Sequence, residues 1–594
     1  MKSSELTGDL ISTISNSASN QRLASFLYAT TMLYIATPCF IFLYGFITWP
    51  TAIIIGTCLV SAIFLDLRKE FKLTSVVSQK SIPLFSVLLI LCMAALWTSI
   101  FGSGFIGPQT GDQLKNHMIF KDLYSNSWPV LYENMPLQMN FLSYPLGYYL
   151  VPALLSKFIG WSLGTFTLYL WTSLGIGLLW CWFLVFFNRY AFIVISLFVL
   201  FSGLDILGTL TQGQPTPLAG EHIEWWAGWT FLQYSSNATV MSWSTQHGAA
   251  QWLLPTLLFY RVICKKDNHG AALAVSLAAF WSHLTILGIL IFLPFFVQNR
   301  QRLIKTLTDP SLLSLPFLML VGTYYFSKSA GSIDSGFIWS LWPSDWIIPK
   351  LMWFYIFEFG ILSLLVYSTR QFRDSDEFQL FVMAVIALLL VPLYHIGWSN
   401  DVSMRVSAIP LYILFLMLST TCIQSWQTQN RPAISILLLY IGISSFTPMN
   451  EMYRQLIQIA PQHFFTSNIS DTNWDRGISR TEKNCLITDR PRTIDLINGD
   501  ILTIKNNGTF IIAKTWTNGN YLNICLERDV VIKKRSSPQA LMELRFFRGT
   551  KELIEHAKIR IIRQPDDIPS IISLWPQQYT GSKDSVFYKI FLRH

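Results

Sequence analysis

The sequence predicts an α-helical polytopic membrane protein with about twelve transmembrane helices and a C-terminal extracytoplasmic mixed α/β domain. Of its 594 residues 52% are hydrophobic and only 13% are charged, whereas soluble proteins carry about 25% charged residues. The 22 Trp and 23 Tyr suit a bilayer protein, because these side chains collect at membrane interfaces. This composition excludes a disordered chain and a compact cytosolic enzyme, and 8 Cys are too sparse for a disulfide scaffold.

The predicted helices follow from apolar runs in the first three quarters of the chain. A bilayer core about 30 Å thick requires roughly 20 apolar residues per helix. Of the candidate spans, 271–297 reads as one long or two short helices. The candidates are 26–46, 52–65, 83–100, 144–159, 165–187, 191–201, 250–264, 271–297, 312–326, 351–367, 380–393, 406–422 and 433–445. We divide the chain into a cytoplasmic tail (1–22), a transmembrane module (23–449) and an extracytoplasmic domain (450–594).

Basic loops predict the orientation, because Lys and Arg are enriched on the cytoplasmic side of membrane proteins. Residues 1–22 are polar and do not form a cleavable signal peptide. We place on the inside the basic stretches 68–72, 188–189, 261–266, 300–305, 370–373 and 427–431. The stretches 102–143, 204–245, 328–349, 395–405 and 450–594 then lie outside. One crossing should separate 102–143 from Arg189, but two apolar runs lie there. A short re-entrant or interfacial helix at 144–159 is one interpretation.

From about residue 450 polar residues return and the apolar runs shorten to the length of strands. Expected strands are 509–513, 530–533, 558–562 and 586–591, with turn signals at 498–500 and 518–519. Cys485 and Cys525 are the two cysteines of this region. In an oxidising compartment they could form a disulfide, and the sequence leaves their pairing open.

The first outer loop carries the most specific pattern. It reads Gly-Asp-Gln-Leu-Lys-Asn-His over 111–117, Trp-Pro-Val over 128–130 and Tyr-Pro-Leu-Gly-Tyr-Tyr over 144–149. We expect a short amphipathic helix after Asp112, with Leu114, Met118 and Leu123 on one side. The pattern resembles the first periplasmic or lumenal loop of GT-C glycosyltransferases, above all the branch of protein O-mannosyltransferases and lipid A aminoarabinose transferases.

This resemblance implies a GT-C type transmembrane module that transfers a sugar from a polyprenyl-phosphate donor on the outer face, with inversion. It implies that Asp112 deprotonates the acceptor or helps to bind a metal. A carboxylate that is partly desolvated at the membrane boundary is a better base. The alternative is that Asp112 caps the helix that starts at Gln113.

The second outer loop adds acidic and imidazole groups. Asp205 ends a span, and many GT-C members have an acidic residue after a later core helix. Together with Glu221, His222, Glu224 and His247 it could bind a divalent cation, Mg or Mn. The alternative is an interfacial loop whose acidic side chains face water. We assign Asp112 and Asp205 to the metal, and Glu221, Glu224 and His247 to acceptor or substrate binding. His283, on an apolar helix, is expected to be a hydrogen-bonded core residue.

The third feature is the loop 395–405. A guanidinium matches a phosphate with two parallel hydrogen bonds. We therefore predict that Arg405 binds the donor phosphate and stabilises it as a leaving group, together with Lys115 and Asn400. His117 and Asp401 are assigned to acceptor or substrate binding. The alternative is that Arg405 snorkels to the interface and pairs with Asp401.

We therefore expect an integral membrane glycosyltransferase of a bacterial inner membrane, with a cell-envelope glycan or lipid as acceptor. Its other partners would be membrane lipids, and no nucleic acid is expected. Two alternatives remain open: a lipid-linked glycan flippase or secondary transporter, and an envelope-glycan polymerase or ligase. The sequence has no Walker A loop, dinucleotide fingerprint, Cys-x-x-Cys, His-Glu-x-x-His or Gly-x-Ser-x-Gly motif. ATP-driven transport and zincin-type proteolysis therefore find no support.

Overall fold

The structure is a computed structural model of the whole chain. It describes residues 18–74, 84–108, 111–134, 138–142, 144–213, 222–226, 230, 232–326, 335–370, 372, 375–397, 400–457, 500–506, 509–518, 521–526, 541–548, 551–560 and 587–591. These residues form two compact units. The helical unit comprises Met1–Asn126, Pro145–Tyr325 and Ser335–Phe465, and the second unit comprises Ser127–Tyr144, Phe326–Asp334 and Thr466–His594.

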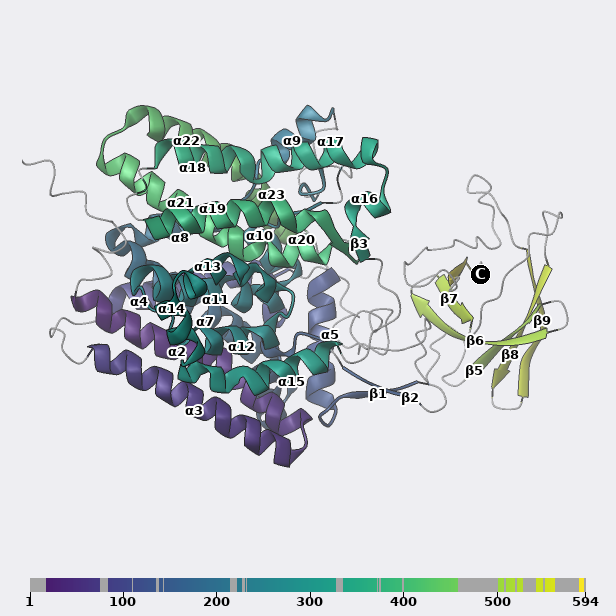
Figure 1. Cartoon of the computed structure of the whole chain (residues 1–594). Coiled ribbons are helices and arrows are strands. Elements are labelled where there is room, and N and C mark those ends of the chain that lie inside the picture. The colour runs from purple at the N-terminus through teal and green to yellow at the C-terminus, as the bar shows by residue number, and fades with distance from the viewer. Residues whose placement is uncertain are drawn as a thin grey trace, which may run out of the picture. The chain divides into compact units, whose positions relative to one another are not determined.

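The helical unit is a bundle of long and short helices (Figure 1). Its α-helices are α2 (Ala18–Phe46), α3 (Trp49–Thr74), α4 (Leu84–Ser99), α5 (Gly111–Ser125), α6 (Leu150–Ile159), α7 (Trp161–Phe187), α8 (Ala191–Leu200), α9 (Asp205–Thr211), α10 (Asn237–Trp243), α11 (Leu254–Phe259), α12 (Ala271–Trp281), α13 (Leu293–Val297), α14 (Arg300–Leu307), α15 (Leu315–Phe326), α16 (Ile338–Leu341), α17 (Ser344–Tyr355), α18 (Ile361–Thr369), α19 (Ser375–Leu390), α20 (Asp401–Val406), α21 (Ala408–Gln427), α22 (Arg431–Ser444) and α23 (Phe446–Ile457). Short 3-10 helices are η1 (Ser103–Phe105), η2 (Leu146–Tyr148), η3 (Asn188–Tyr190), η5 (Thr245–His247), η8 (Thr285–Phe292), η9 (Pro310–Ser314) and η11 (Val391–Leu393). Three π-helical turns are η6 (Ala249–Leu253), η7 (Tyr260–Cys264) and η10 (Ile356–Gly360).

Seven helices of the described residues are long and apolar enough to cross a membrane, or eight if the bent pair Arg300–Leu307 and Pro310–Tyr325 is one span. This finding supports a polytopic helical membrane protein. The predicted number of about twelve counted shorter apolar segments as well, among them α4, α6 and α12. Breaks at polar or small residues divide these segments, so a hydropathy count exceeds the count of long helices.

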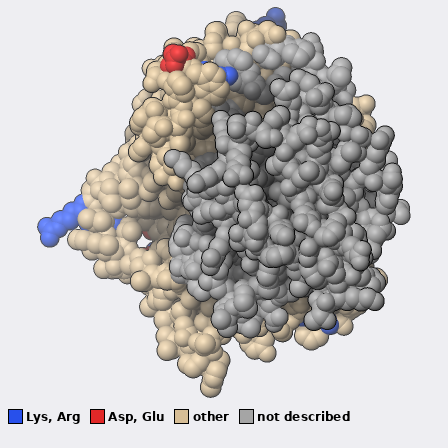
Figure 2. All heavy atoms as spheres, turned by 90° about the vertical axis from the view of Figure 1, so that its right-hand side faces the viewer, with Lys and Arg blue, Asp and Glu red and all other residues tan. Residues whose placement is uncertain are grey.

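The surface of the helical unit carries many apolar side chains. Exposed large residues recur on the outer helices, for example Ile54 and Phe64 on α3, Leu364 on α18 and Leu439 on α22. Figure 2 shows that the described surface on one face has few charged side chains. Such a surface is favourable in contact with lipid, whereas soluble proteins rarely expose large contiguous apolar patches.

Helix α6 lies within the extra apolar run 144–159, which the sequence shows before Arg189. It has ten residues, and at 1.5 Å per residue it is roughly 15 Å long, half of the bilayer core. The chain turns back at Gly160, where the next helix α7 begins. Lys157 of α6 donates to the carbonyl oxygens of Tyr124 and Asn126, at 2.8 and 2.7 Å, and so holds the end of α5. This length fits the interpretation of 144–159 as a re-entrant or interfacial helix, which stays a prediction.

The run 271–297 forms two short helical arms rather than one span. Helix α12 ends at Trp281, and η8 and α13 follow after a turn at Ser282. The Asn268 side chain, just before α12, donates to the carbonyl oxygen of Phe295 at 3.2 Å. The two arms therefore start and finish side by side and make a re-entrant hairpin whose tip carries Ser282 and His283.

The predicted inner loops gather at one end of the helical unit. Lys69 pairs with Asp267 at 3.1 Å, Lys266 with Asp376 at 2.9 Å, and Arg370 with Glu377. Predicted outer stretches meet one another in the same way, because β3 (Ser335–Phe337) pairs with β4 (Tyr394–Ile396). These contacts join predicted inner loops to one another and predicted outer stretches to one another. The side of the membrane that each set faces stays a prediction.

Helix α23 contains the predicted domain boundary at residue 450. It ends at Ile457 and belongs to a 27-residue candidate span that starts at Arg431. Its residues Glu451 and Arg454 are buried within the helical unit.

The described part of the second unit consists of strands. A hairpin pairs β1 (Leu131–Asn134) with β2 (Gln138–Phe141). An antiparallel sheet has the order β10-β7-β6-β5-β8-β9. Its strands are β5 (Asp500–Asn506), β6 (Thr509–Asn518), β7 (Tyr521–Leu526), β8 (Leu541–Arg548), β9 (Lys551–Arg560) and β10 (Phe587–Phe591). The expected strands 509–513 and 586–591 fall on β6 and β10, whereas 530–533, Cys485 and the side chain of Cys525 lie outside the described residues.

Candidate functional site

The candidate site is built on α5, the helix that the first outer loop predicts. The expected apolar side chains Met118 and Leu123 are buried, while the side chain of Leu114 lies outside the described residues. Two amides fix the helix to the segment around η5. Gln113 Nε2 donates to Thr245 Oγ1 at 3.0 Å and to the Met241 carbonyl at 2.9 Å. Figure 1 shows α5, α16, α20 and β3 at the same end of the helical unit.

A second amide, Asn116, is fully buried between two partners. Its Nδ2 donates to Gln246 Oε1 at 3.2 Å, and its Oδ1 accepts from the Tyr149 hydroxyl at 2.7 Å. Tyr149 belongs to the Pro-Leu-Gly-Tyr-Tyr stretch of the sequence pattern. The pattern residues therefore join the first outer loop to the second through hydrogen bonds.

Asp112 lies in the first turn of α5, where a carboxylate interacts favourably with the helix dipole. Lys115 Nζ is 3.0 Å from Asp112 Oδ1. The two side chains keep 33% and 18% of their surface exposed, so a ligand can reach both. Asp112 and Lys115 therefore form a partly exposed ion pair.

Arg405 stands on α20 one turn after Asp401, at an Nη2–Oδ1 distance of 3.7 Å. The Arg405 side chain is 15% exposed, and that of Asp401 is 46% exposed. Asn400 precedes α20 with a left-handed backbone (φ 53°), and its Oδ1 accepts from the Ser403 N–H at 3.3 Å. Asn400 therefore caps α20. Its buried Nδ2 has no hydrogen-bond partner in the described part of the chain.

Lys115 and Arg405, one from each group of charges, both act electrostatically on His247. It is 8% exposed, and its Nδ1 is 2.9 Å from Ser282 Oγ at the tip of the re-entrant hairpin. Burial and then the positive charges of Arg405, His283 and Lys115 hold the pKa of His247 well below its ordinary value. The imidazole is therefore neutral, and Lys115 and Arg405 both lie close enough to act on it.

His283, at the same tip, stacks on Tyr325 with ring centroids 4.6 Å apart. Its side chain is half-buried, so His283 is not the enclosed core residue that the sequence predicts. The tip of the hairpin thus carries His283 and contacts His247 of η5 through Ser282.

His117 is packed against Phe105 in the turn before α5. Its Nε2 accepts from the Phe105 N–H at 3.3 Å, and its ring stacks on the Phe105 ring at 3.7 Å. Burial lowers the pKa of His117 to about 3, so the ring stays neutral. These contacts secure the turn before α5 rather than present the imidazole to a ligand.

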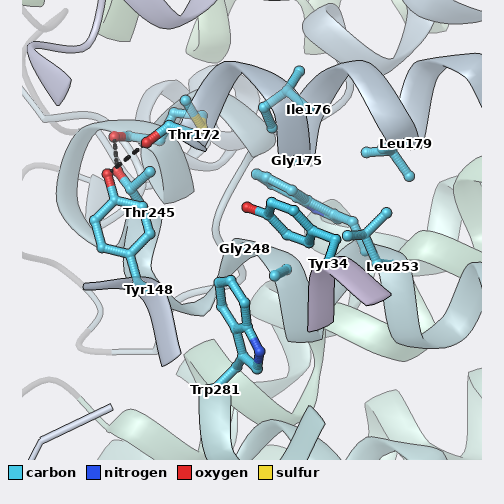
Figure 3. A pocket seen from close by; sticks show the side chains of 13 residues that line it. Tyr34, Tyr148, Thr172, Gly175, Ile176, Leu179, Thr245, Gly248, Leu253 and Trp281 are labelled. Atoms are coloured by element: carbon cyan, nitrogen blue, oxygen red, sulfur yellow. Dashed lines mark hydrogen bonds between the residues drawn. The ribbon is translucent and has the colours of Figure 1, made fainter. Parts of the chain in front are cut away.

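A small cavity lies next to Met241 and Thr245, which accept hydrogen bonds from Gln113 (Figure 3). Its volume is about 20 Å³, which is room for roughly one water molecule. Tyr148 and Thr172 are hydrogen-bonded at 2.8 Å on its wall. The other lining residues are Tyr34, Gly175, Ile176, Leu179, Met241, Thr245, Gly248, Ala249, Trp252, Leu253 and Trp281. This cavity is too small for a sugar, so the exposed atoms around Lys115 and Arg405 are the accessible part of the site.

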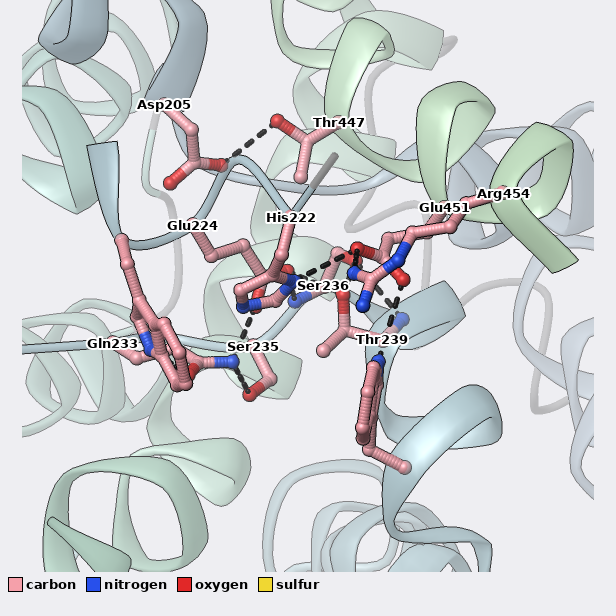
Figure 4. A network of polar contacts seen from close by, with 12 residues as sticks. Asp205, His222, Glu224, Gln233, Ser235, Ser236, Thr239, Thr447, Glu451 and Arg454 are labelled. Atoms are coloured by element: carbon pink, nitrogen blue, oxygen red, sulfur yellow. Dashed lines mark hydrogen bonds and ion pairs between the residues drawn. The ribbon is translucent and has the colours of Figure 1, made fainter. Parts of the chain in front are cut away.

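A second polar network surrounds Glu224 (Figure 4). Glu224 is fully buried, and its Oε1 accepts from the Ser236 N–H at 2.8 Å and the Thr239 hydroxyl at 2.6 Å. Its Oε2 accepts from Gln233 Nε2 at 2.5 Å. Burial raises the pKa of Glu224 to about 7, with His222 opposing the shift and Asp205 adding to it. Glu224 therefore pins its loop to the start of α10.

Glu451 of α23 completes this network. His222 Nδ1 and Arg454 Nη1 each lie 2.8 Å from Glu451 Oε1. Burial alone would lower the pKa of His222, but the hydrogen bond to Glu451 and the charge of Glu224 outweigh it and raise the pKa. Sequence reasoning placed Glu451 and Arg454 in the C-terminal domain and missed them.

Asp205 is also buried, and three donors converge on it. Ser202 Oγ and Thr447 Oγ1 donate to its Oδ2 at 3.0 and 2.9 Å, and Trp226 Nε1 donates to its Oδ1 at 3.4 Å. Glu358, in η10, is buried close to Asp205 and was not selected from the sequence. In the sequence, the signal that could have identified Glu358 is that it is a lone acidic residue within the apolar run 351–367.

The tentative metal site has no ligand set among the described residues, since no three His, Cys, Asp or Glu side chains there are arranged to hold an ion. Asp112 pairs with Lys115, while the bonded neighbours of Asp205 are neutral donors of the second network. Glu221 lies outside the described residues. The structure thus brings Asp112, Lys115, His247 and Arg405 together, and gathers Asp205, His222 and Glu224 elsewhere.

Comparisons with known proteins gave no relative. No protein-family model, no curated protein and no solved structure matches the chain.

Proposed function

We propose that the protein is an integral membrane glycosyltransferase that moves a sugar from a polyprenyl-phosphate donor to a cell-envelope glycan or lipid, with inversion. The observation that carries the proposal is the convergence of Lys115 and Arg405 on His247, with Asp112 beside Lys115. Two cations at one partly exposed site suit a phosphate, and an adjacent carboxylate suits the deprotonation of a hydroxyl.

The roles follow from the chemistry of the side chains. Arg405 binds two phosphate oxygens and stabilises the leaving phosphate. Lys115 is a flexible point charge, so it moves from Asp112 to the donor phosphate when the donor binds. Asp112, released from its ion pair, accepts the proton of the acceptor hydroxyl while that oxygen attacks C1 of the sugar. The C1–phosphate bond breaks on the opposite side.

In this proposal the site faces the extracytoplasmic water layer of a bacterial inner membrane. The support is that the predicted inner loops join one another through ion pairs such as Lys266–Asp376, whereas Asp112 and Arg405 belong to predicted outer stretches. The region 450–594 is then periplasmic and would help to hold the acceptor.

Purified protein incubated with radiolabelled polyprenyl-phosphate sugars and an envelope lipid fraction tests the activity. We expect Asp112→Asn and Arg405→Ala to abolish transfer and Arg405→Lys to weaken it. Asp345→Asn is the matched control, because Asp345 is an exposed acidic residue in the first turn of α17. Wild-type transfer by Asp112→Asn would reject the acid-base role, and would be expected of a polymerase or ligase driven by Arg and His. An arm with EDTA tests whether a divalent cation is needed.

A second candidate function, a secondary transporter or flippase, is favoured by two observations. Glu358 lies in a π-helical turn inside the candidate span Ser344–Thr369, and ionisable residues within spans mark transport pathways. The re-entrant hairpin after Gly270 resembles the broken helices of transporters. Reconstituted vesicles that move a lipid-linked sugar without forming a product, with loss in Glu358→Gln and not in Asp112→Asn, would support this function over the transferase.

A further inference from the structure

The second network contains two acidic side chains that no cation neutralises. Glu358 is 2% exposed, and neither of its carboxylate oxygens accepts a hydrogen bond of normal geometry from the described residues. It lies beside Asp205 and Trp226, and a Cβ placed on Gly203 would meet Glu358 Oε2. Glu358 is therefore packed directly against the segment that starts α9.

Asp205 has the opposite surroundings. Its oxygens accept from Ser202, Thr447 and the Trp226 indole. Three neutral donors around one carboxylate favour its ionised form. The oxygens of Glu358 accept no hydrogen bond of normal geometry from the described residues, although Trp226 lies next to both carboxyl groups.

The other charged groups of the network do not balance a second negative charge. His222 and Arg454 both pair with Glu451. Glu224 also faces Asp205 and Glu358 and adds negative charge. The remaining titratable groups that face the pair are two tyrosines: Tyr440, which donates to the Ser202 carbonyl, and Tyr234, which donates to the Leu388 carbonyl. Two ionised carboxylates in contact at this depth would repel strongly, because the interior screens charge poorly.

We propose that Asp205 and Glu358 form a proton-binding site within the membrane-spanning region, in which the two carboxyl groups share one proton. Glu358 carries the proton and donates it in an O–H···O hydrogen bond to Asp205. Loss of the proton to water leaves two carboxylates and a net change of one negative charge. The site does not depend on the proposed transferase activity.

The π-helical turn makes this pairing possible. An α-helix that continued through Ile356–Gly360 would have one fewer residue in that turn, and a π-bulge is a common way to present a functional side chain. The Phe357 carbonyl at this turn accepts from the Leu204 N–H at 2.9 Å. The backbone of η10 is thereby held against the start of α9, which keeps Glu358 next to Asp205.

Infrared spectroscopy of the purified full-length protein tests the site, because a protonated carboxyl has a C=O band that a carboxylate lacks. At about pH 8, well above the ordinary pKa of Glu, we expect wild-type protein to keep this band. Glu358→Gln and Asp205→Asn should lose it, whereas Glu451→Gln, which alters an ion-paired carboxylate, should keep it. Absence of the band from wild-type protein, or an equal band in Glu358→Gln, would overturn the proposal.

Thermal unfolding in detergent gives an independent reading. Glutamine resembles a protonated glutamate and can donate an N–H to Asp205, so Glu358→Gln should unfold at the wild-type temperature at about pH 7. Wild-type protein should unfold at lower temperature as the pH is raised further, and Glu358→Gln should lose this decline. Stabilisation of wild-type protein by added Na⁺ or Mg²⁺ without a carboxyl band would identify a bound cation instead and reject the shared proton.

Discussion

At the scale of single residues, buried polar groups divide into those that hold the structure and those that can act. Both carboxylate oxygens of Glu224 are engaged by neighbouring backbone and side chains, and His117 Nε2 accepts from the Phe105 N–H. Lys115 and Arg405 retain exposed surface next to one buried imidazole. Glu224 and His117 were predicted to be site residues, but our proposal uses Lys115 and Arg405 instead.

Glu224 gives a prediction on pH dependence. Its pKa rises to about 7 in the folded protein, whereas an unfolded chain has about 4.3. The folded state binds the extra proton between these values, so the contribution of this group to stability is present at low pH and is lost as the pH rises to about 7. By this shift we expect the loss to be on the order of 3 kcal/mol. Glu224→Gln should flatten that part of the pH profile of thermal unfolding. An unchanged slope would contradict the assignment.

The pKa of His117 predicts that stability changes with pH in the opposite direction. Burial lowers its pKa to about 3, and the unfolded value is about 6.5. The folded state therefore resists protonation, and stability is lost as the pH falls from about 6.5 toward 3. His117→Gln keeps an acceptor for the Phe105 N–H, and should reduce the loss of stability on acidification. Lys157→Gln, which alters only contacts at the far end of α5, is the control, and an equal effect there would contradict the prediction.

At the scale of elements, the sequence predicted helix α5, because polar residues there follow an apolar run. It placed Arg405 in a loop, whereas Arg405 lies on helix α20. It could not predict the π-helical turns, the re-entrant hairpin or the pairing of α23 with the second outer loop. Those features depend on which distant side chains pack together. Glu451, for example, follows a span in sequence, and only its contacts with His222 and Arg454 reveal a buried network.

The start of α12 gives a prediction on stability. Gly270 has φ 75°, and a Cβ there would meet Asp66 and the Tyr28 hydroxyl. Asp66 belongs to a buried ionic cluster, in which its Oδ1 is 3.4 Å from Arg261 Nη2 and 3.2 Å from His269 Nε2. Gly270→Ala should therefore destabilise the protein by about 3 kcal/mol, from backbone strain and overpacking together.

The matched control for this variant is Gly213→Ala. Gly213 also has a positive φ, 65°, but a Cβ there meets no atom within 4 Å. It should cost about 1 kcal/mol, the strain alone. Tryptophan fluorescence during thermal unfolding measures both variants. Equal losses would show that Asp66 and Tyr28 are not packed against this turn.

At the scale of the whole molecule, the charge pattern and the structure lead to one topology. The ends of α3, α12, α14 and α19 are linked by the pairs Lys69–Asp267, Lys266–Asp376 and, at 3.9 Å, Arg302–Asp376. All three basic residues lie in predicted inner stretches. If α6 does not cross and the hairpin returns to its own side, the topology predicted from the charges puts residues 1–22 inside and the end of α23 outside.

Cysteine labelling in whole cells tests this topology. Asp345 begins α17 and Lys305 lies on α14, and both are exposed in the helical unit. In a background in which the eight native cysteines are replaced, Asp345→Cys should react with a membrane-impermeant maleimide added outside, and Lys305→Cys should react only after permeabilisation. Positive charge retained on the cytoplasmic side is the physical reason. Labelling of both cysteines in intact cells, or of Lys305→Cys alone, would place Asp112 and Arg405 on the cytoplasmic face or break the separation of loops, and would remove the outer-face transferase proposal.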